Sequence, residues 1–271
     1  MDFASSTPSP GSQDAAQTGR VLGVIPARLG SSRLPRKPLH PILGRPLIQW
    51  ACERARGMGI LDDVVVATDA PEIVEVCENV GVTALLTDPD HPSGTDRVAE
   101  VVGRPAYRNA AIVVNLQGDE PLLDPGHVRA AVDEVQRGRD IGTCATPLRE
   151  AERLRDPAAV KVVRRADGTA LYFSRAPIPH RRDGPMDGDF LARGGYLRHL
   201  GLYAYRREAL LAWVALPPSP LEEIERLEQL RALEAGMTIG VAVVEHAEDG
   251  VDTLDDAHRT EQRMRELGLG S

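Results

Sequence analysis

Short apolar segments that alternate with segments of helical spacing constrain the fold of this chain most. The runs VLGVIP at 21–26, DVVVAT at 63–68 and AIVVN at 111–115 are apolar at nearly every position, and a helical pattern follows each of them. Strands that are apolar on both faces are typical of parallel sheets that helices cover. The pattern therefore predicts an α/β fold with a mostly parallel central sheet and helices on both faces.

The expected elements follow one another along the chain. We expect strands over Val21–Pro26, Asp63–Thr68, Thr83–Leu86, Ala111–Asn115, Thr143–Thr146, Val160–Arg164, Tyr196–Tyr205 and Thr238–Val244. We expect helices over Pro46–Met58, Pro71–Asn79, Thr95–Val102, Pro125–Gln136, Ala151–Arg155, Leu221–Ala235 and Asp255–Leu267. The stretch Ala176–Tyr196, rich in Pro, Gly and Arg, interrupts the alternation and predicts a long loop or a protruding arm.

The length of 271 residues fits one large domain. Residues 1–19 have neither a basic head nor an apolar stretch, so we interpret them as a disordered tail and residues 20–271 as a single domain. No apolar run is long enough to span a bilayer. The three cysteines, Cys52, Cys77 and Cys144, show no metal-binding spacing and are expected to be buried thiols. A cytoplasmic location without membrane contact is predicted.

Charge is distributed unevenly. The net charge of −8 argues against nucleic acid as a partner, yet Arg28, Arg33, Arg36 and Lys37 lie in a ten-residue stretch without an acid. The small residues Gly30, Ser31 and Ser32 in the same stretch can bring backbone N–H groups close to phosphate oxygens. This favours a small anionic ligand, with a solvated basic loop as the alternative. Neither GxxxxGK[ST] nor GxGxxG is present, which argues against a P-loop NTPase and a dinucleotide-binding dehydrogenase.

Two loops are expected at the ligand-binding edge of the sheet. Ala27–Pro38 and Gln117–Pro121 each follow a predicted strand, and ligands bind beyond the carboxyl ends of such strands. Asp119 and Glu120 in the second loop suit a cation with oxygen ligands such as Mg²⁺, although an exposed acidic turn would look the same. Asp252, taken alone, is typical of a helix cap.

Ordered motifs along the chain also carry a resemblance to a known family. The segment PARLGSSRLPRKPL at 26–39 resembles the phosphate-binding loop of sugar nucleotidyltransferases, and within them that of the 3-deoxy-manno-octulosonate (Kdo) cytidylyltransferase family. Further segments match that family in the same order: HPSGTDR at 91–97, NLQGDEP at 115–121, ALYFSRA at 170–176, LRHLGLY at 197–203, PLEEIERLEQL at 220–230 and GVDT at 250–253. The resemblance implies a Rossmann-like nucleotidyltransferase fold and the transfer of CMP from CTP to a small acidic acceptor, with release of pyrophosphate.

The resemblance also implies roles for individual residues. CTP would be bound by Pro26, Ala27, Arg28, Gly30, Ser31, Ser32, Arg33, Lys37, Ser93, Gly94 and Arg97. Asp119 and Asp252 would hold the Mg²⁺ cofactor and, with Arg28 and Lys37, form the catalytic set. The acceptor would contact Gln117, Arg175, His199, Tyr203, Glu228 and Gln229, among which Arg or His suits a carboxylate and the others suit hydroxyls. A protruding arm at about 174–205 would pair two subunits in a homodimer.

Some features leave the acceptor open. Arg36 stands where the family often has glycine, and 180–196 matches only in general character. Kdo is the first expectation, and another ulosonic acid or a small phosphonate is the alternative. A sugar-1-phosphate nucleotidyltransferase that uses UTP or GTP, and a nucleotide sensor without catalysis, are the rival functions.

Overall fold

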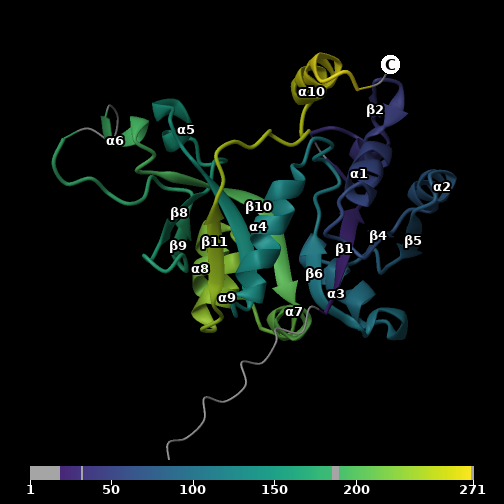
Figure 1. The fold of residues 1–271 in the computed structure, drawn as a ribbon, viewed down its shortest axis with the longest axis horizontal. Helices are drawn as coiled ribbons and strands as arrows, with labels where there is room; N and C mark the ends of the chain where they lie inside the picture. The colour runs from purple at the N-terminus through teal and green to yellow at the C-terminus, as the bar shows by residue number, and fades with distance from the viewer. Residues whose placement is uncertain (1–18, 32, 185–188, 270–271) are drawn as a thin grey trace, which may run out of the picture.

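The computed structural model describes residues 19–31, 33–184 and 189–269, so nearly all of the predicted tail lies outside the described residues. One large sheet runs through the middle of the molecule, in the order β11-β7-β10-β6-β1-β4-β5, with β8 and β9 attached beside β10 (Figure 1). All of its neighbouring pairs on this path are parallel except those of β10, which is antiparallel to both β6 and β7. The α/β fold with a mostly parallel sheet is therefore confirmed.

The strands of the large sheet are β1 (Arg20–Ala27), β4 (Asp63–Thr68), β5 (Thr83–Leu86), β6 (Ala110–Asn115), β7 (Ile141–Pro147), β8 (Lys161–Arg164), β9 (Ala170–Ser174), β10 (Leu197–Arg206) and β11 (Ile239–Val243). A two-stranded hairpin pairs β2 (Pro41–Ile42) with β3 (Arg45–Pro46). The α-helices are α1 (Leu47–Arg56), α2 (Pro71–Asn79), α3 (Gly94–Gly103), α4 (Pro125–Gln136), α5 (Ala151–Arg155), α6 (Asp189–Ala192), α7 (Arg207–Val214), α8 (Pro220–Glu225), α9 (Gln229–Glu234) and α10 (Leu254–Glu266). Most predicted elements are confirmed within a few residues, whereas α6, α7, the β2–β3 hairpin and β9 were not predicted as elements.

The order of the first strands fixes where a ligand can bind. The strands β5, β4, β1 and β6 lie side by side in this order. After β1, the chain adds β4 and β5 on one side of β1, and it then places β6 on the opposite side of β1. This reversal is the switch point of a Rossmann-like sheet, where the loops after two neighbouring strands diverge and leave a crevice. The loop after β1 and the loop after β6 meet at this point, because Val24 of β1 pairs with Asn115 of β6.

Buried side chains form a layer on each face of the sheet. On one face α1, α2 and α4 pack their apolar sides on the strands, and on the other face α3, α7 and α9 do so. Cys52 of α1 and Cys77 of α2 are fully buried with their Sγ atoms 4.0 Å apart, and Cys144 is buried too. The predicted burial of the cysteines is confirmed, and the proximity of two of them is a result of the packing of α1 on α2.

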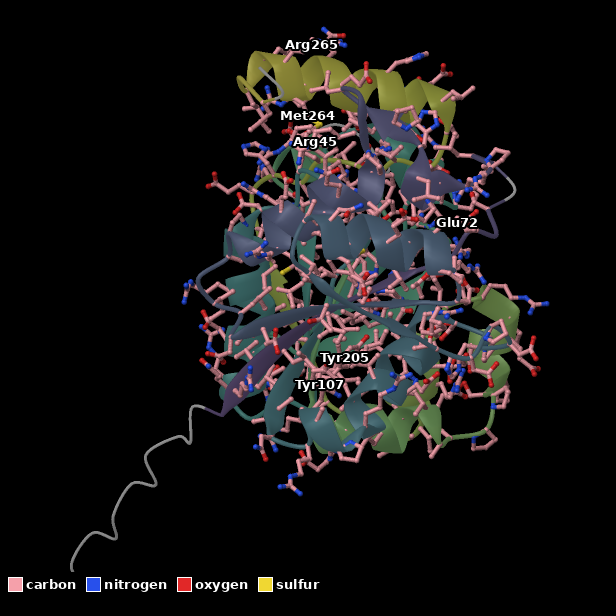
Figure 2. All side chains as sticks on the ribbon, turned by 90° about the vertical axis from the view of Figure 1, so that its right-hand side faces the viewer. Arg45, Glu72, Tyr107, Tyr205, Met264 and Arg265 are labelled. Atoms are coloured by element: carbon pink, nitrogen blue, oxygen red, sulfur yellow. The ribbon has the colours of Figure 1, made fainter. Side chains whose placement is uncertain are left out.

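The helix α10 covers the end of the molecule at which the site lies. Figure 2 shows Met264 on the side of α10 that faces the rest of the protein and Arg265 on its outer side. Met264 is fully buried, in a cluster with Ile42, Leu47 and Val251. This cluster holds the segment before α10 against α1 and the β2–β3 hairpin.

The expectation of one helix over Leu221–Ala235 was wrong. The helix α8 ends at Glu225 and is followed by Arg226, whose φ of 53° is left-handed, and α9 begins at Gln229. A capping box at Ser219 starts α8, and Glu222 at its third position also pairs with Arg231 of α9. These contacts hold the two short helices in a bent arrangement that the helical spacing of the sequence does not reveal.

The predicted arm between β9 and β10 contains α6 and little other regular structure among its described residues. Leu191 and Tyr196 are buried against Leu148 and Leu154, so the arm packs with α5 into a small cluster of its own. Among the helices that the structure describes, none is both long and apolar enough to cross a bilayer.

Candidate active site

A cavity of about 1680 Å³ opens at the carboxyl ends of the strands, beside the switch point. It is lined by nine of the residues singled out from the sequence: Pro26, Gly94, Gln117, Asp119, His199, Tyr203, Glu228, Gln229 and Asp252. These residues come from the end of β1, the loop after β6, α3, β10, the α8–α9 junction and the segment before α10. The fold thus brings residues predicted to bind CTP and residues predicted to bind the acceptor to one cavity.

A backbone hydrogen bond links the loop that carries Asp119 to the segment that carries Asp252. The N–H of Val251 donates a 2.9 Å hydrogen bond to the carbonyl of Asp119. Gly118 allows the first loop to lie close to β1, since a Cβ there would meet Ile25 Cγ2 at 3.3 Å. Asp252 does not cap α10, because Thr253 accepts from the N–H of Asp256 and serves as the cap. The carboxylate of Asp252 is therefore available to the site.

The ammonium of Lys37 lies between the two predicted metal ligands. Its Nζ donates to Asp119 Oδ2 and lies 3.0 Å from Asp252 Oδ1. Burial lowers the pKa of Lys37, but the two carboxylates outweigh it and raise that pKa above its ordinary value. Arg33 pairs with the second oxygen of Asp252 at 3.0 Å. The two acids thus face a common point that a cation occupies.

The rest of the phosphate loop lies beside this cluster. Arg28 is exposed, and Ala27 is buried at the end of β1. Ser31 Oγ accepts from the N–H of Leu34 at 3.4 Å and so closes the turn. Ser32 lies outside the described residues. Arg36 adopts a left-handed conformation with φ 55° and pairs with Glu72 of α2 at 3.2 Å.

The start of α3 packs on the phosphate loop. A Cβ at Gly94 would lie 3.4 Å from Cγ of Pro26, and Ser93 caps the helix by accepting from the N–H of Asp96. Arg97 is only 3% exposed and binds Thr87 and Asp69, at 3.2 Å from the latter. Arg97 thus holds the loops after β4 and β5 in place, and it is absent from the cavity wall.

A hydrogen bond links the predicted nucleotide side of the cavity to the predicted acceptor side. Thr95 Oγ1 donates to Oε2 of Glu228 at 3.0 Å. Burial raises the pKa of Glu228, and the hydrogen bond from Thr95 partly opposes this shift. Glu228 occupies the bend between α8 and α9, which is where the expected single helix is broken.

The strand β10 carries a β-bulge at the acceptor side. Its pairing with β7 shifts register between Leu200 and Tyr203. Such bulges leave backbone groups without ladder partners and are frequent next to active sites. Here Gln117 Nε2 donates to the carbonyl of Gly201 at 2.8 Å, so Gln117 keeps its Oε1 for other contacts.

The imidazole of His199 is fixed on several sides. Phe173 meets it edge-on with ring centroids 4.9 Å apart, and Tyr203 lies at 5.3 Å. Its Nε2 lies 3.0 Å from Thr143 Oγ1. Burial, with a smaller contribution from Arg198, lowers the pKa of His199 to about 3. His199 is therefore neutral near pH 7. Burial raises the pKa of Tyr203 well above its usual value.

Arg175 lies apart from the cavity. Its guanidinium binds three backbone carbonyls, those of Glu225 at 2.8 Å, Pro157 at 2.9 Å and Arg226 at 3.1 Å. Two of these carbonyls belong to the end of α8. In this conformation Arg175 stabilises the α8–α9 bend, and it is not among the residues of the cavity wall.

Several residues of the site carried no assigned role in the sequence. Asp249 binds both Arg153 at 2.8 Å and Arg198 at 3.0 Å, which anchors the segment that leads to Asp252. Glu120, unlike these residues, was a cation-binding candidate in the sequence; burial and the nearby Asp119 raise its pKa to about 8. Arg198 belongs to the motif LRHLGLY at 197–203, and Asp249 directly precedes GVDT at 250–253, but no pattern in the sequence pairs them.

A loop with small residues and cations, facing two carboxylates at the switch point of a Rossmann-like sheet, defines the class of nucleotide-binding α/β enzymes that transfer nucleotidyl groups. Comparison with known proteins narrows this class. The family model described as cytidylyltransferase matches residues 22–239. The chain belongs to the cytidylyltransferase family, within its 3-deoxy-manno-octulosonate cytidylyltransferase branch.

Individual relatives are similar over nearly their whole length. The 3-deoxy-manno-octulosonate cytidylyltransferase of Gemmatimonas aurantiaca is 49% identical, over 88% of this chain and 92% of the relative. That of Acidobacterium capsulatum is also 49% identical, over 91% of this chain and 97% of the relative. A solved structure of CMP:2-keto-3-deoxy-manno-octonic acid synthetase complexed with CTP matches with a TM-score of 0.83 and 39% identity, over 92% of this chain and 99% of the other.

Proposed function

We propose that this enzyme transfers CMP from CTP to Kdo, forming CMP-Kdo and pyrophosphate. The observation that carries the proposal is the convergence of Lys37, Asp119 and Asp252 at the mouth of the phosphate loop. The relatives named for this activity, at 49% identity over most of the chain, support the same acceptor. In the reaction the oxygen of an acceptor hydroxyl forms a bond to the α-phosphorus and loses its proton to water, the bond from that phosphorus to the bridging oxygen breaks, and pyrophosphate leaves.

The residues present fit a magnesium ion. Asp119 and Asp252 offer carboxylate oxygens toward one point, and the ammonium of Lys37 serves there as a stand-in cation. Among the described residues no group of three or more acidic, His or Cys side chains forms a complete metal cage. Two carboxylates with phosphate and water as the other ligands are the arrangement that Mg²⁺ prefers. When bound by Asp119 and Asp252, the ion would supply charge stabilisation at the α-phosphate.

The side chains of the phosphate loop bind the nucleotide in this proposal. Arg28 and Arg33 are exposed and can reach triphosphate oxygens, and Lys37 is held charged at the point where negative charge grows during transfer. Fixed cations of this kind stabilise a transferring phosphoryl group without covalent chemistry. Gly94 and Ser93 place the start of α3 against Pro26, where backbone groups can read the base or ribose.

The acceptor lies across the cavity from the nucleotide. Gln117, His199, Tyr203, Glu228 and Gln229 line this part of the wall and offer hydroxyl-binding groups. The homodimer, with the arm at about 174–205 in the contact, and the cytoplasmic location stay predictions. Sedimentation of the purified protein at micromolar concentration tests the dimer, and a monomer there would contradict it.

Pyrophosphate release with CTP and a panel of acceptors tests the proposed function. The panel contains Kdo, another ulosonic acid and a small phosphonate, and UTP and GTP replace CTP in matched reactions. We expect product with CTP and Kdo. Product from the phosphonate alone would contradict Kdo as the acceptor and leave the assignment of CMP transfer intact. Product with UTP in preference to CTP would contradict CTP as the nucleotide substrate. No turnover with any combination of nucleotide and acceptor would favour a nucleotide sensor without catalysis.

A further inference from the structure

The hydroxyl of Thr143 in β7 makes three polar contacts at the bulge of β10. Its Oγ1 lies 2.7 Å from the carbonyl of Leu202, 3.2 Å from that of Leu200 and 3.0 Å from Nε2 of His199. Thr143 itself is fully buried. The register shift of β10 at these residues explains why the two carbonyls accept from a side-chain donor.

Proton counting determines the direction of these hydrogen bonds. A threonine hydroxyl has one hydrogen to donate and two lone pairs that accept, whereas a carbonyl only accepts. The single hydrogen points to the nearer carbonyl, that of Leu202 at 2.7 Å, because two oxygens at this distance need a hydrogen between them. The contact with His199 at 3.0 Å is then a hydrogen bond only if the ring donates from Nε2.

We propose that Thr143 is a positioning residue that fixes His199 in the tautomer protonated on Nε2, so that Nδ1 faces the acceptor sugar as a hydrogen-bond acceptor for one of its hydroxyls. This inference rests on the proposed function for the identity of the ligand. The assignment of the tautomer to Thr143 rests on the geometry alone.

Two further observations support an accepting Nδ1. With its pKa lowered to about 3, the ring carries only one proton near pH 7, so one nitrogen has a free lone pair. His199 lines the cavity, and within the described part of the chain no side chain or backbone group bonds its Nδ1. Phe173 and Tyr203 hold the ring plane in place.

The consequence concerns specificity. An unprotonated Nδ1 attracts a hydroxyl, which has a hydrogen to donate, and repels a carboxylate, which has none. The suggestion from the sequence that a histidine could bind the carboxylate of the acceptor is therefore not favoured for His199. The ring selects a polyhydroxylated acceptor oriented with a hydroxyl at this point of the wall.

The test combines nitrogen NMR with kinetics. In ¹⁵N-labelled wild-type protein we expect His199 to show a protonated Nε2 and an unprotonated Nδ1, with the signals assigned by their loss in H199Q. Thr143→Val keeps the shape but removes the hydroxyl, and we expect mixed tautomers and a KM for Kdo raised about tenfold, the effect of about 1.4 kcal/mol from one lost hydrogen bond. The KM for CTP should stay within about twofold, as expected for a site that does not contact Thr143.

Thr143→Ser is the matched control, because it restores the hydroxyl and should restore both the tautomer and the KM for Kdo. A proton on Nδ1 in the wild type would overturn the proposal, as would an unchanged tautomer in Thr143→Val. The NMR measurement on the wild type needs neither turnover nor a stable variant. If the wild type fails to use Kdo, the proposed function fails, while the tautomer still decides the role of Thr143.

Discussion

Nζ of Lys37 lies 3.0 Å from Oδ1 of Asp252, although 215 positions separate the two residues in the chain. The contact connects the segment after β1 to the segment before α10 at the candidate site. It also places a charged group of the phosphate loop on a carboxylate that can serve a metal ion. Substitutions on each side of this contact should therefore affect different parts of the reaction.

Asp119→Asn and Asp252→Asn should each lower the turnover number on the order of a thousandfold. Each change keeps the shape and removes one of the two charges that we propose to hold Mg²⁺, which should cost several kcal/mol of transition-state stabilisation. Steady-state pyrophosphate release at saturating Mg²⁺ measures the effect. Asp255→Asn, an exposed residue in the first turn of α10, is the control and should keep normal turnover. Near-normal rates in either site variant would contradict the assignment.

Lys37→Ala should lower kcat/KM for CTP by at least about tenfold and leave the fold intact. The side chain is held by Asp119 and Asp252 rather than by a core, so its main loss is a charge-assisted contact worth about 1.5–3 kcal/mol. Measurement of kcat/KM for CTP, together with a thermal melt followed by circular dichroism, separates an effect on CTP use from an effect on folding. An unchanged kcat/KM would show that Lys37 is a structural partner of the acids only.

Arg36→Gly should be more stable than Arg36→Ala by about 1 kcal/mol. A left-handed φ of 55° strains any residue with a Cβ, and glycine adopts it without that strain. The ion pair with Glu72 is exposed on both sides and contributes little. Figure 2 shows Glu72 at the outer side of the molecule. Urea unfolding of the two variants measures the difference, and equal stability would argue against the strain. Both should use CTP as the wild type does.

Arg175→Lys should destabilise the protein by about 2 kcal/mol. The guanidinium reaches three carbonyls at once, which the single ammonium of lysine cannot do. The measurement is the free energy of unfolding together with KM for the acceptor. A fully stable variant with a raised KM for the acceptor alone would instead restore the role that the resemblance implied for Arg175.

The ionised side chain of Glu100 should make the free energy of unfolding depend on pH in the acidic range. Burial raises its pKa, but Arg104, the N–H of Asp88 and His91 outweigh this and lower that pKa from 4.5 to about 2. A lowered pKa in the folded state adds stability above the unfolded value near 4.5, and this stability is lost as the pH falls toward about 2. The difference in unfolding free energy between wild type and Glu100→Gln should therefore shrink across that window. A difference independent of pH would contradict the ionised contact.

The secondary structure and the chemistry of the two loops could be predicted from the sequence. Continuous apolar runs such as DVVVAT at 63–68 predict buried strands, because they are short, rich in β-branched valine and apolar on both faces, as in a sheet that helices cover. The basic loop with Lys37 and the acidic loop with Asp119 were recognisable, since each follows such a strand and its residue types suit one ligand. Ordered motifs then indicated the family, which the comparison with known proteins confirmed.

Which side chains meet, and which are already bound to other groups, could be learned from the folded protein alone. Arg175 and His199 belong to motifs of equal quality, yet one binds backbone carbonyls and the other lines the cavity. The bend at Arg226, which brings Glu228 to Thr95, also could not be derived from helical spacing. Hydrogen bonds and burial depend on partners far away in the chain, whereas a sequence pattern reports on neighbours along the chain.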